Sequence, residues 1–157
     1  MIDPVQVREF LAYRRIAVFG ASDDPEKFGG TIYRQLIEHG YDAAPVNPNT
    51  ATVADKACYP DLDSVPGHVD GAIVVVNRDK AAGVVQDCID RGVPRVWLFK
   101  GLGGASAVSE EALELCRRHG IDVIAGACPL MFLEPVAGVH RFHRALRRIN
   151  GSLAKAS

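Results

Sequence analysis

The stretch Arg15–Ser22 limits the fold of this chain more than any other. Four apolar residues, Ile16–Phe19, run into a glycine and a small hydroxyl residue. Such a run, rich in β-branched residues, is typical of a strand buried on both faces. The glycine pair Gly29 and Gly30 then opens a segment whose apolar residues have helical spacing. Strand, glycine turn and helix in this order form half of a nucleotide-binding βαβ unit, in which backbone N–H groups face a phosphate.

Strands and helices alternate through the rest of the chain. Further strands are predicted at 43–48, 69–77, 95–99 and 121–125, the first of them short and near an edge because prolines flank it. Helices are predicted at the N-terminus, up to His39, from Asp79 to Gly92, from Ser109 to Gly120 and at about 138–149. This alternation predicts an α/β, three-layer Rossmann-like fold with a doubly wound, five-stranded, mainly parallel sheet.

Sequence patterns also predict details of these elements. Val5, Phe10 and Leu11 are expected on one face of the leading helix, and Asp79 is expected to cap the helix that follows residue 77. Residues 49–66 are polar and rich in turn formers, so we expect a small excursion with a brief helical turn there. Residues 1–150 are predicted to form a single domain, and residues 151–157 a frayed C-terminal tail.

Composition excludes several classes of protein. The chain has 157 residues, 48% hydrophobic and 24% charged, which is typical of a globular domain with its own core. A net charge of −1 gives no overall attraction to nucleic acid, and no apolar run is long enough to span a membrane. The N-terminus does not resemble a signal peptide. The cysteines have no metal-ligand spacing. We therefore expect a cytoplasmic protein with reduced thiols and no metal site.

The ends of the predicted strands indicate where a ligand binds. In doubly wound sheets the ligand lies outside the carboxyl ends of the strands. These ends carry the following residues: Gly20, Ala21 and Ser22; Asn47, Pro48 and Asn49; Asn77 and Arg78; Lys100 and Gly101; Gly126, Ala127 and Cys128. We expect them to form one rim.

The charges at this rim favour a phosphorylated nucleotide. The second strand ends in Asn47, where NAD-binding sheets present an acidic residue to the ribose, so a ribose phosphate meets no repulsion there. Arg78, Lys100 and Lys27 supply positive charge for phosphate groups. The alternative interpretation is that Arg78 and Lys100 are solvated surface charges, and for Lys27 an ordinary loop charge is the favoured one. Coenzyme A (CoA), which carries a diphosphate and a ribose phosphate, fits this pattern best. NADP is its competitor.

Taken together, the short motifs resemble one family. These motifs are G-A-S at 20–22, V-N-P at 46–48, V-D-x-x-x-V-x-x-x-R at 69–78, V-W-L at 96–98 and C-P-L-M at 128–131. From about residue 10 to 135 the chain resembles the CoA-binding-domain proteins, which are similar to the N-terminal domain of the succinyl-CoA synthetase alpha subunit. The resemblance implies a Rossmann-like fold with CoA or an acyl-CoA lying across the strand ends.

The resemblance also implies a role for each strand end. It places Gly20, Ala21 and Ser22 at the diphosphate and the segment from Phe99 to Gly101 near the pantetheine. The adenosine part would be surrounded by Val46, Asn47, Pro48 and Asn49 from one strand end and by Val76, Asn77 and Arg78 from the next.

The chain departs from the family pattern in three places. A basic residue commonly follows the proline of V-N-P, whereas this chain has Asn49; relatives often carry a glutamine where this chain has Lys100, which could compensate. The synthetase alpha subunit has a second domain with a phosphorylated histidine, and this sequence ends before such a domain. We therefore expect a stand-alone, non-catalytic protein that binds CoA or acyl-CoA, and we assign no catalytic residue.

Alternative functions remain open at this point. The chain could be an NADP-dependent oxidoreductase, although no proton-handling residue stands out. It could also be a subunit of a multi-chain acyl-CoA synthetase, with a partner from acyl-CoA metabolism, or a homo-oligomer. Cys128 could form a mixed disulfide with CoA, but a small, buried thiol is the favoured interpretation. The basic run His140–Arg148 is interpreted as an exposed helix face, with binding to nucleic acid or an acidic partner as the alternative.

Overall fold

The structure, a computed structural model, describes residues 2–12, 15–101 and 104–133. Its central sheet has the spatial order β2-β1-β5-β6-β7, and each pairing between neighbours is parallel. The strands are β1 (Arg15–Phe19), β2 (Asp42–Val46), β5 (Gly71–Val74), β6 (Arg95–Phe99) and β7 (Asp122–Ala127). The predicted five-stranded parallel sheet and Rossmann-like fold are therefore confirmed.

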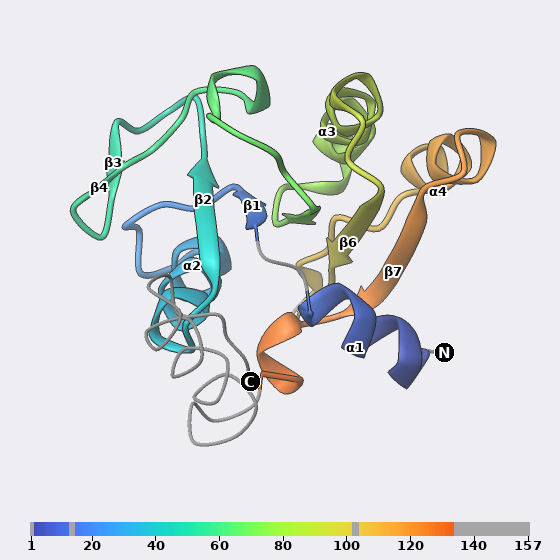
Figure 1. Cartoon of the computed structure of the whole chain (residues 1–157), viewed down its shortest axis with the longest axis horizontal. Helices are drawn as coiled ribbons and strands as arrows, with labels where there is room; N and C mark the ends of the chain where they lie inside the picture. Colours follow the sequence, from blue (N-terminus) through green and yellow to red (C-terminus); the bar gives the residue numbers. More distant parts are fainter. Residues whose placement is uncertain (1, 13–14, 102–103, 134–157) are drawn as a thin grey trace, which may run out of the picture.

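Helices cover both faces of this sheet. The helices are α1 (Pro4–Leu11), α2 (Phe28–Glu38), α3 (Arg78–Arg91) and α4 (Glu110–Arg118). Alternate strand residues point to opposite faces, so Ala17 packs in the core with α3 and α4, and Val18 in the core with α1 and α2. Figure 1 shows α3 and α4 side by side, away from α1 and α2. The three layers follow from this alternation.

The prolines place β2 at the edge, as predicted. The carbonyl of Pro45 faces away from β1 and accepts a hydrogen bond from the backbone N–H of Tyr59, at 2.9 Å. The N–H that Pro45 lacks would point to the same outer side, so no bond between β2 and β1 is lost. Asn47 in turn donates its backbone N–H to the carbonyl of Tyr59, at 2.8 Å. The chain near Tyr59 therefore runs along the outer edge of β2.

The segment 49–66 forms the predicted excursion with a helical turn. It contains a two-stranded hairpin, β3 (Thr52–Val53) and β4 (Lys56–Ala57), followed by the 3-10 helix η1 (Leu62–Ser64). The two residues at the hairpin turn, Ala54 and Asp55, both have positive φ angles, 51° and 62°. This two-residue turn matches the twist of paired strands.

Several details of the elements differ from the prediction: one buried position, one helix cap and the length of one strand. Val5 is exposed, and Val7 instead joins Phe10 and Leu11 on the buried face of α1. The prediction that Asp79 caps α3 is wrong, because Asn77 is the N-cap residue and Asp79 lies in the first helical turn. β5 is shorter than the predicted 69–77, although residues 70 and 75 still donate backbone hydrogen bonds to β1.

The predictions for the C-terminal part of the chain lie beyond residue 133, the last described residue. The helix predicted at 138–149 and the tail at 151–157 lie outside the described residues. Within the described part of the chain, no helix combines the length and apolar character needed to cross a membrane. The short 3-10 helix η3 (Pro129–Met131) follows β7.

Candidate functional site

A cavity of about 470 Å³ lies at the carboxyl ends of four strands, and we call it the strand-end cavity. Its lining includes Phe19 and Gly20 after β1, Asn47 after β2, Val76 after β5, and Phe99 at the end of β6. The start of α2 and one face of α3 complete the walls. The chain passes from β1 outward to β2 and then returns to the other side of β1 with β5, so the strand order reverses between β1 and β5. The cavity includes this switch point.

Three glycines permit close backbone packing at this edge. Gly20 has a φ angle of +89°, and a Cβ there would lie 2.0 Å from the carbonyl oxygen of Val75. A Cβ on Gly29 would lie 2.2 Å from the carbonyl oxygen of Gly20, and one on Gly30 would lie 1.7 Å from that of Ser22. Only glycine fits at these positions. The β1–α2 connection is therefore folded back against the start of α2.

The N-terminus of α2 is open at the cavity. Its N-cap residue, Lys27, makes no side-chain hydrogen bond to the helix, and the first turn holds no acidic residue. Asp3 caps α1 and Ser109 caps α4 through their side chains. Asn77, the N-cap residue of α3, also lines the cavity without a side-chain cap bond, but the first turn of α3 carries Asp79. Lys27, Phe28 and Gly29 all line the cavity. The first backbone N–H groups and the positive end of the helix dipole are thus available to an anion.

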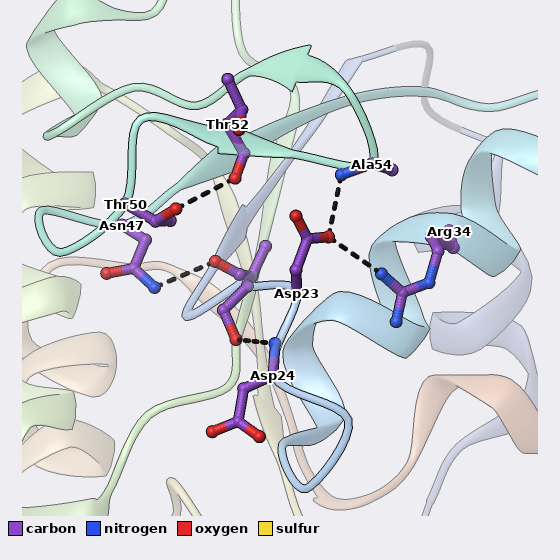
Figure 2. Close-up of polar contacts among 9 residues, drawn as sticks. Asp23, Asp24, Arg34, Asn47, Thr50, Thr52 and Ala54 are labelled. Carbon is purple, nitrogen blue, oxygen red and sulfur yellow. Dashed lines mark hydrogen bonds and ion pairs between the residues drawn. The ribbon is translucent and has the colours of Figure 1, made fainter.

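Hydrogen bonds fix the loops around this opening, as Figure 2 shows. Asn47 donates from Nδ2 to the carbonyl oxygen of Ala21 at 2.9 Å, and so ties the end of β2 to the end of β1. Asp23 Oδ1 accepts from the backbone N–H of Ala54 at 3.0 Å and pairs with Arg34 Nη1 at 3.3 Å. Through these two contacts, Asp23 connects the β1–α2 loop to the hairpin at Ala54 and to α2 at Arg34.

The cavity contains both signs of charge. Lys27 and Lys80 line it, and so do the acidic residues Glu26, Asp61 and Asp87. The prediction that a ribose phosphate meets no repulsion considered only the strand ends and needs correction: these acids line the same cavity from the β1–α2 loop, the 49–66 excursion and the body of α3. The Asp87 side chain is exposed; the limited desolvation that it has raises the pKa of its carboxyl, and the neighbouring carboxylates of Asp90, Asp63 and Asp61 raise it further.

The cavity has an apolar part beside β6. The rings of Phe28 and Phe99 pack with centroids 5.2 Å apart, and both residues line the cavity together with Ala105. A Cβ on Gly101 would lie 2.6 Å from the ring of Phe99, so glycine at this position leaves the ring where it is. An apolar wall of this kind suits an uncharged chain better than a phosphate.

The structure gathers part of the predicted rim at the cavity. Nine of the predicted residues line it: Gly20, Lys27, Val46, Asn47, Pro48, Asn49, Val76, Asn77 and Phe99. Eight other predicted residues, all described, are not among its lining residues: Ala21, Ser22, Arg78, Lys100, Gly101, Gly126, Ala127 and Cys128.

Local structure explains the positions of the second group. Ala21 is fully buried, and the Ser22 hydroxyl accepts the backbone N–H of Asp24 at 3.2 Å. Arg78 is exposed in the first turn of α3, and Lys100 is exposed where its backbone N–H donates to Ala127.

Cys128 also lies in this second group, just before η3. Burial raises the pKa of the Cys128 thiol, and the backbone hydrogen bond from Leu130 lowers it by less. A raised pKa reduces the thiolate fraction at neutral pH.

Sequence reasoning missed several lining residues. Gly29 had a usable signal, because a glycine pair at a helix start already indicates close backbone approach. Lys80 and Asp87 could be found only from the face that α3 turns toward the strand ends. Asp61 had no local signal, because the pairing of Tyr59 with β2 brings it to the cavity.

The fold and the cavity define a nucleotide-binding domain of the Rossmann-like class. Residues 14–134 match the family described as CoA binding domain. The chain belongs to this family of CoA-binding domains, which confirms the resemblance inferred from its motifs.

Two curated relatives show how the domain occurs elsewhere. The chain is 30% identical over 125 residues to the ADP-forming acetate–CoA ligase II subunit alpha of Pyrococcus furiosus. The matched region covers 76% of this chain and 27% of that protein. The chain is 27% identical over 124 residues to the uncharacterized protein YneT of Bacillus subtilis, covering 78% of this chain and 88% of that one. The chain thus spans about a quarter of the ligase subunit and most of YneT.

Among solved structures, a similar domain again forms most of one small chain and about a quarter of a longer one. A hypothetical protein from Pyrococcus horikoshii OT3 superposes with a TM-score of 0.76 and 28% identity, covering 83% of this chain and 89% of that one. The dinucleotide-forming acetyl-coenzyme A synthetase 1 of Ca. Korarchaeum cryptofilum superposes with a TM-score of 0.64 and 32% identity, covering 74% of this chain and 26% of that one.

Proposed function

We propose that this chain is a stand-alone, non-catalytic binding protein for CoA or an acyl-CoA, which it holds in the strand-end cavity. The observation that carries the proposal is the uncapped N-terminus of α2, where Lys27, Phe28 and Gly29 line the cavity. An open helix N-terminus beside a lysine suits a diphosphate, because backbone N–H groups and the helix dipole both favour negative charge there. Membership of the CoA-binding domain family points to the same ligand.

The rest of the ligand follows the polarity of the walls. The apolar wall at Phe28 and Phe99 suits the pantetheine chain, which carries no charge. The wall formed by Pro48, Val76 and Val84 suits the adenosine part, since it offers apolar surface beside the strand ends. Diphosphate, pantetheine and adenosine then occupy three distinct parts of one cavity.

Binding measurements test this proposal directly. Calorimetry with CoA, acetyl-CoA, NAD, NADP and ATP should give the highest affinity for the CoA species, and thermal shifts should follow the same order. Lys27→Gln should weaken CoA binding about tenfold, since it removes a charge from the diphosphate. Lys56→Gln is the matched control, because Lys56 lies on β4 and is not among the lining residues. Tighter binding of NADP than of CoA would overturn the proposal in favour of a redox protein.

A second candidate function is that of a CoA-binding subunit in a multi-chain acyl-CoA synthetase. The match to a ligase that is itself named a subunit alpha supports it. The test is immunodepletion of this chain from native extract, followed by an assay of ADP-forming acyl-CoA ligase activity. Activity that falls on depletion and returns when the purified chain is added supports the subunit role, and unchanged activity overturns it.

A further inference from the structure

One face of α3 presents a fixed order of chemical groups to the cavity. Lys80, Val84 and Asp87 all line it, and their spacing of i, i+4 and i+7 places them on the same side of the helix. Seven residues of helix span about 10 Å, so the cation and the carboxylate are two turns apart with an apolar side chain between them. The order along the face is therefore positive, apolar and negative.

A short segment extends this wall at its acidic end. Pro60 and Asp61 line the same cavity, and the following helix η1 packs against α3. The Arg91 guanidinium donates hydrogen bonds to the carbonyl oxygens of Leu62, Val65 and Gly67, which fixes the segment on α3. A flat apolar group beside Val84 would thus have Pro60 nearby and carboxylates at its far edge.

The two carboxylates there differ in their availability. Asp61 Oδ1 already accepts from the backbone N–H and the hydroxyl of Ser64, at 2.9 and 2.7 Å. For the Asp87 carboxylate the structure shows no hydrogen-bond or ion-pair partner among the residues that it describes. An ionised carboxylate accepts hydrogen bonds and donates none, so Asp87 is complementary to an N–H group and repels a carbonyl oxygen.

We infer that this α3 face selects an adenine nucleotide, with Asp87 accepting a hydrogen bond from the exocyclic amino group of the base and Lys80 pairing with the ribose phosphate. The inference rests on the proposed function, since it concerns the nucleotide end of the same ligand. The order of groups along α3 matches the order along an adenosine ribose phosphate: an anionic phosphate, a flat base and an amino donor at the far edge. Hypoxanthine carries a carbonyl oxygen where adenine carries the amino group, and Asp87 would oppose it.

Adenosine 3′,5′-bisphosphate and inosine 3′,5′-bisphosphate are the probes: they share the sugar and both phosphates and differ only at the base edge, where the amino group and accepting N1 of adenine become a carbonyl oxygen and an N1–H in hypoxanthine. Purine riboside 3′,5′-bisphosphate, which lacks the amino group and keeps N1 as an acceptor, is the third probe and should bind as weakly as the inosine compound. Calorimetry should show at least tenfold tighter binding of the adenosine compound to the wild-type chain. In Asp87→Asn the ratio should fall below threefold, because the asparagine amide can donate to a carbonyl oxygen as well as accept from an amino group. Asp90→Asn is the matched control: Asp90 lies on the same helix, accepts from Gln86 Nε2 at 2.9 Å and is not a lining residue.

Lys80 is tested by a second pair of ligands. Wild-type protein should bind CoA more tightly than dephospho-CoA, and Lys80→Gln should reduce that preference at least threefold, whereas Lys56→Gln should keep it. Equal ratios in wild type and Asp87→Asn, or an equal loss in Asp90→Asn, would overturn the assignment of Asp87. An unchanged preference in Lys80→Gln would overturn that of Lys80. If CoA binds with no preference for the amino group, only this inference fails; if CoA itself does not bind, the proposed function fails with it.

Discussion

The side-chain amide of Asn47 donates a hydrogen bond to the backbone carbonyl of Ala21, 26 residues earlier in the chain, at a distance of 2.9 Å. The Asn47 Oδ1 atom at the same time accepts the backbone N–H of Asn49, also at 2.9 Å. One half-buried side chain therefore sets both the end of β2 and the start of the β1–α2 loop. This makes Asn47 a positioning residue for the strand-end cavity, in addition to being part of its lining.

Asn47→Ala removes both hydrogen bonds. We expect a loss of about 1–3 kcal/mol in the free energy of unfolding, because the carbonyl of Ala21 loses its side-chain partner in a partly buried site. CoA affinity should fall as well, since the loop that leads to α2 is no longer tied to β2. Urea denaturation and calorimetry measure the two effects. Asn49→Ala is the control for the unfolding free energy alone, because only the backbone N–H of Asn49 takes part in the hydrogen bond and Asn49 itself lines the cavity. Lys56→Gln, outside the lining, is the control for CoA affinity.

Substitution of glycine by alanine should have opposite effects at two helical positions. In Gly30→Ala the new Cβ would lie 1.7 Å from the carbonyl oxygen of Ser22, so the loop must move away from α2. Overpacking of this kind destabilises by about 1–3 kcal/mol, and we expect CoA binding to weaken at least tenfold with it. In Gly83→Ala the Cβ meets open space in the middle of α3, and better helix propensity should stabilise by about 0.5–1 kcal/mol. Melting temperatures that fall in both variants would contradict the assigned packing.

Arg91 should stabilise the wall of the cavity formed by Pro60 and Asp61, although Arg91 is not itself a lining residue. Its guanidinium holds the carbonyls of Leu62, Val65 and Gly67, so Arg91→Met leaves three acceptors without this partner. Hydrogen bonds to a charged group contribute about 1.5–3 kcal/mol, and we expect a loss of that order in unfolding free energy. Hydrogen exchange should accelerate in residues 60–67, and less in β1. Arg118→Met removes the same charge from an exposed position and should leave exchange in 60–67 unchanged.

The sequence allowed prediction of the sheet because its signals are local. The apolar runs at 16–19 and 96–99 require burial on both faces, and glycines after the helices mark their ends, so the order of elements and the parallel sheet followed. Which strand lay at the edge also followed, since Pro45 cannot donate a backbone hydrogen bond.

The cavity was harder to predict because its walls are not all strand ends. Lys80 and Asp87 reach it from the body of α3, and their place depends on the rotation of that helix, which tertiary packing sets. Asp61 reaches it because Tyr59 pairs beside β2. Arg78 and Lys100 follow strand ends in sequence but are exposed and absent from the lining, because a residue next to a strand end can point away from the cavity.

The thiols should differ in reactivity according to burial. Cys116 is fully buried, and burial raises its pKa to about 11; burial raises that of Cys88 as well. We expect both to react with a thiol reagent such as DTNB only when the protein unfolds. Cys128 is partly exposed and should react in the native state, but more slowly than free cysteine because burial raises its pKa too. Intact-mass analysis after incubation with CoA disulfide should likewise show an adduct at Cys128 that forms more slowly than with free cysteine. A faster adduct, removed by Cys128→Ser, would support the alternative of a mixed disulfide between Cys128 and CoA.

The stability of the protein should also depend on pH through Asp87. The Asp87 side chain is exposed, so solvent screens the effect and keeps it small: limited desolvation and the carboxylates of Asp90, Asp63 and Asp61 raise its pKa in the folded state, while Lys80 and Arg91 are the cations nearest to it along α3. A raised folded-state pKa means that the folded protein binds the proton more tightly than the unfolded chain does, so ionisation of Asp87 lowers stability. This penalty is absent below the ordinary pKa of an aspartate, grows as the pH rises through the raised pKa, and is fully present at neutral pH.

Asp87→Asn should therefore unfold at a higher urea concentration than wild type at pH 7, and the difference should shrink as the pH falls to 4.5. Glu38→Gln, a change at an exposed carboxylate on α2, serves as the control and should show no such gain at pH 7. If Asp87→Asn is instead less stable than wild type at pH 7, the carboxylate has a structural partner and its assignment to the base must be abandoned.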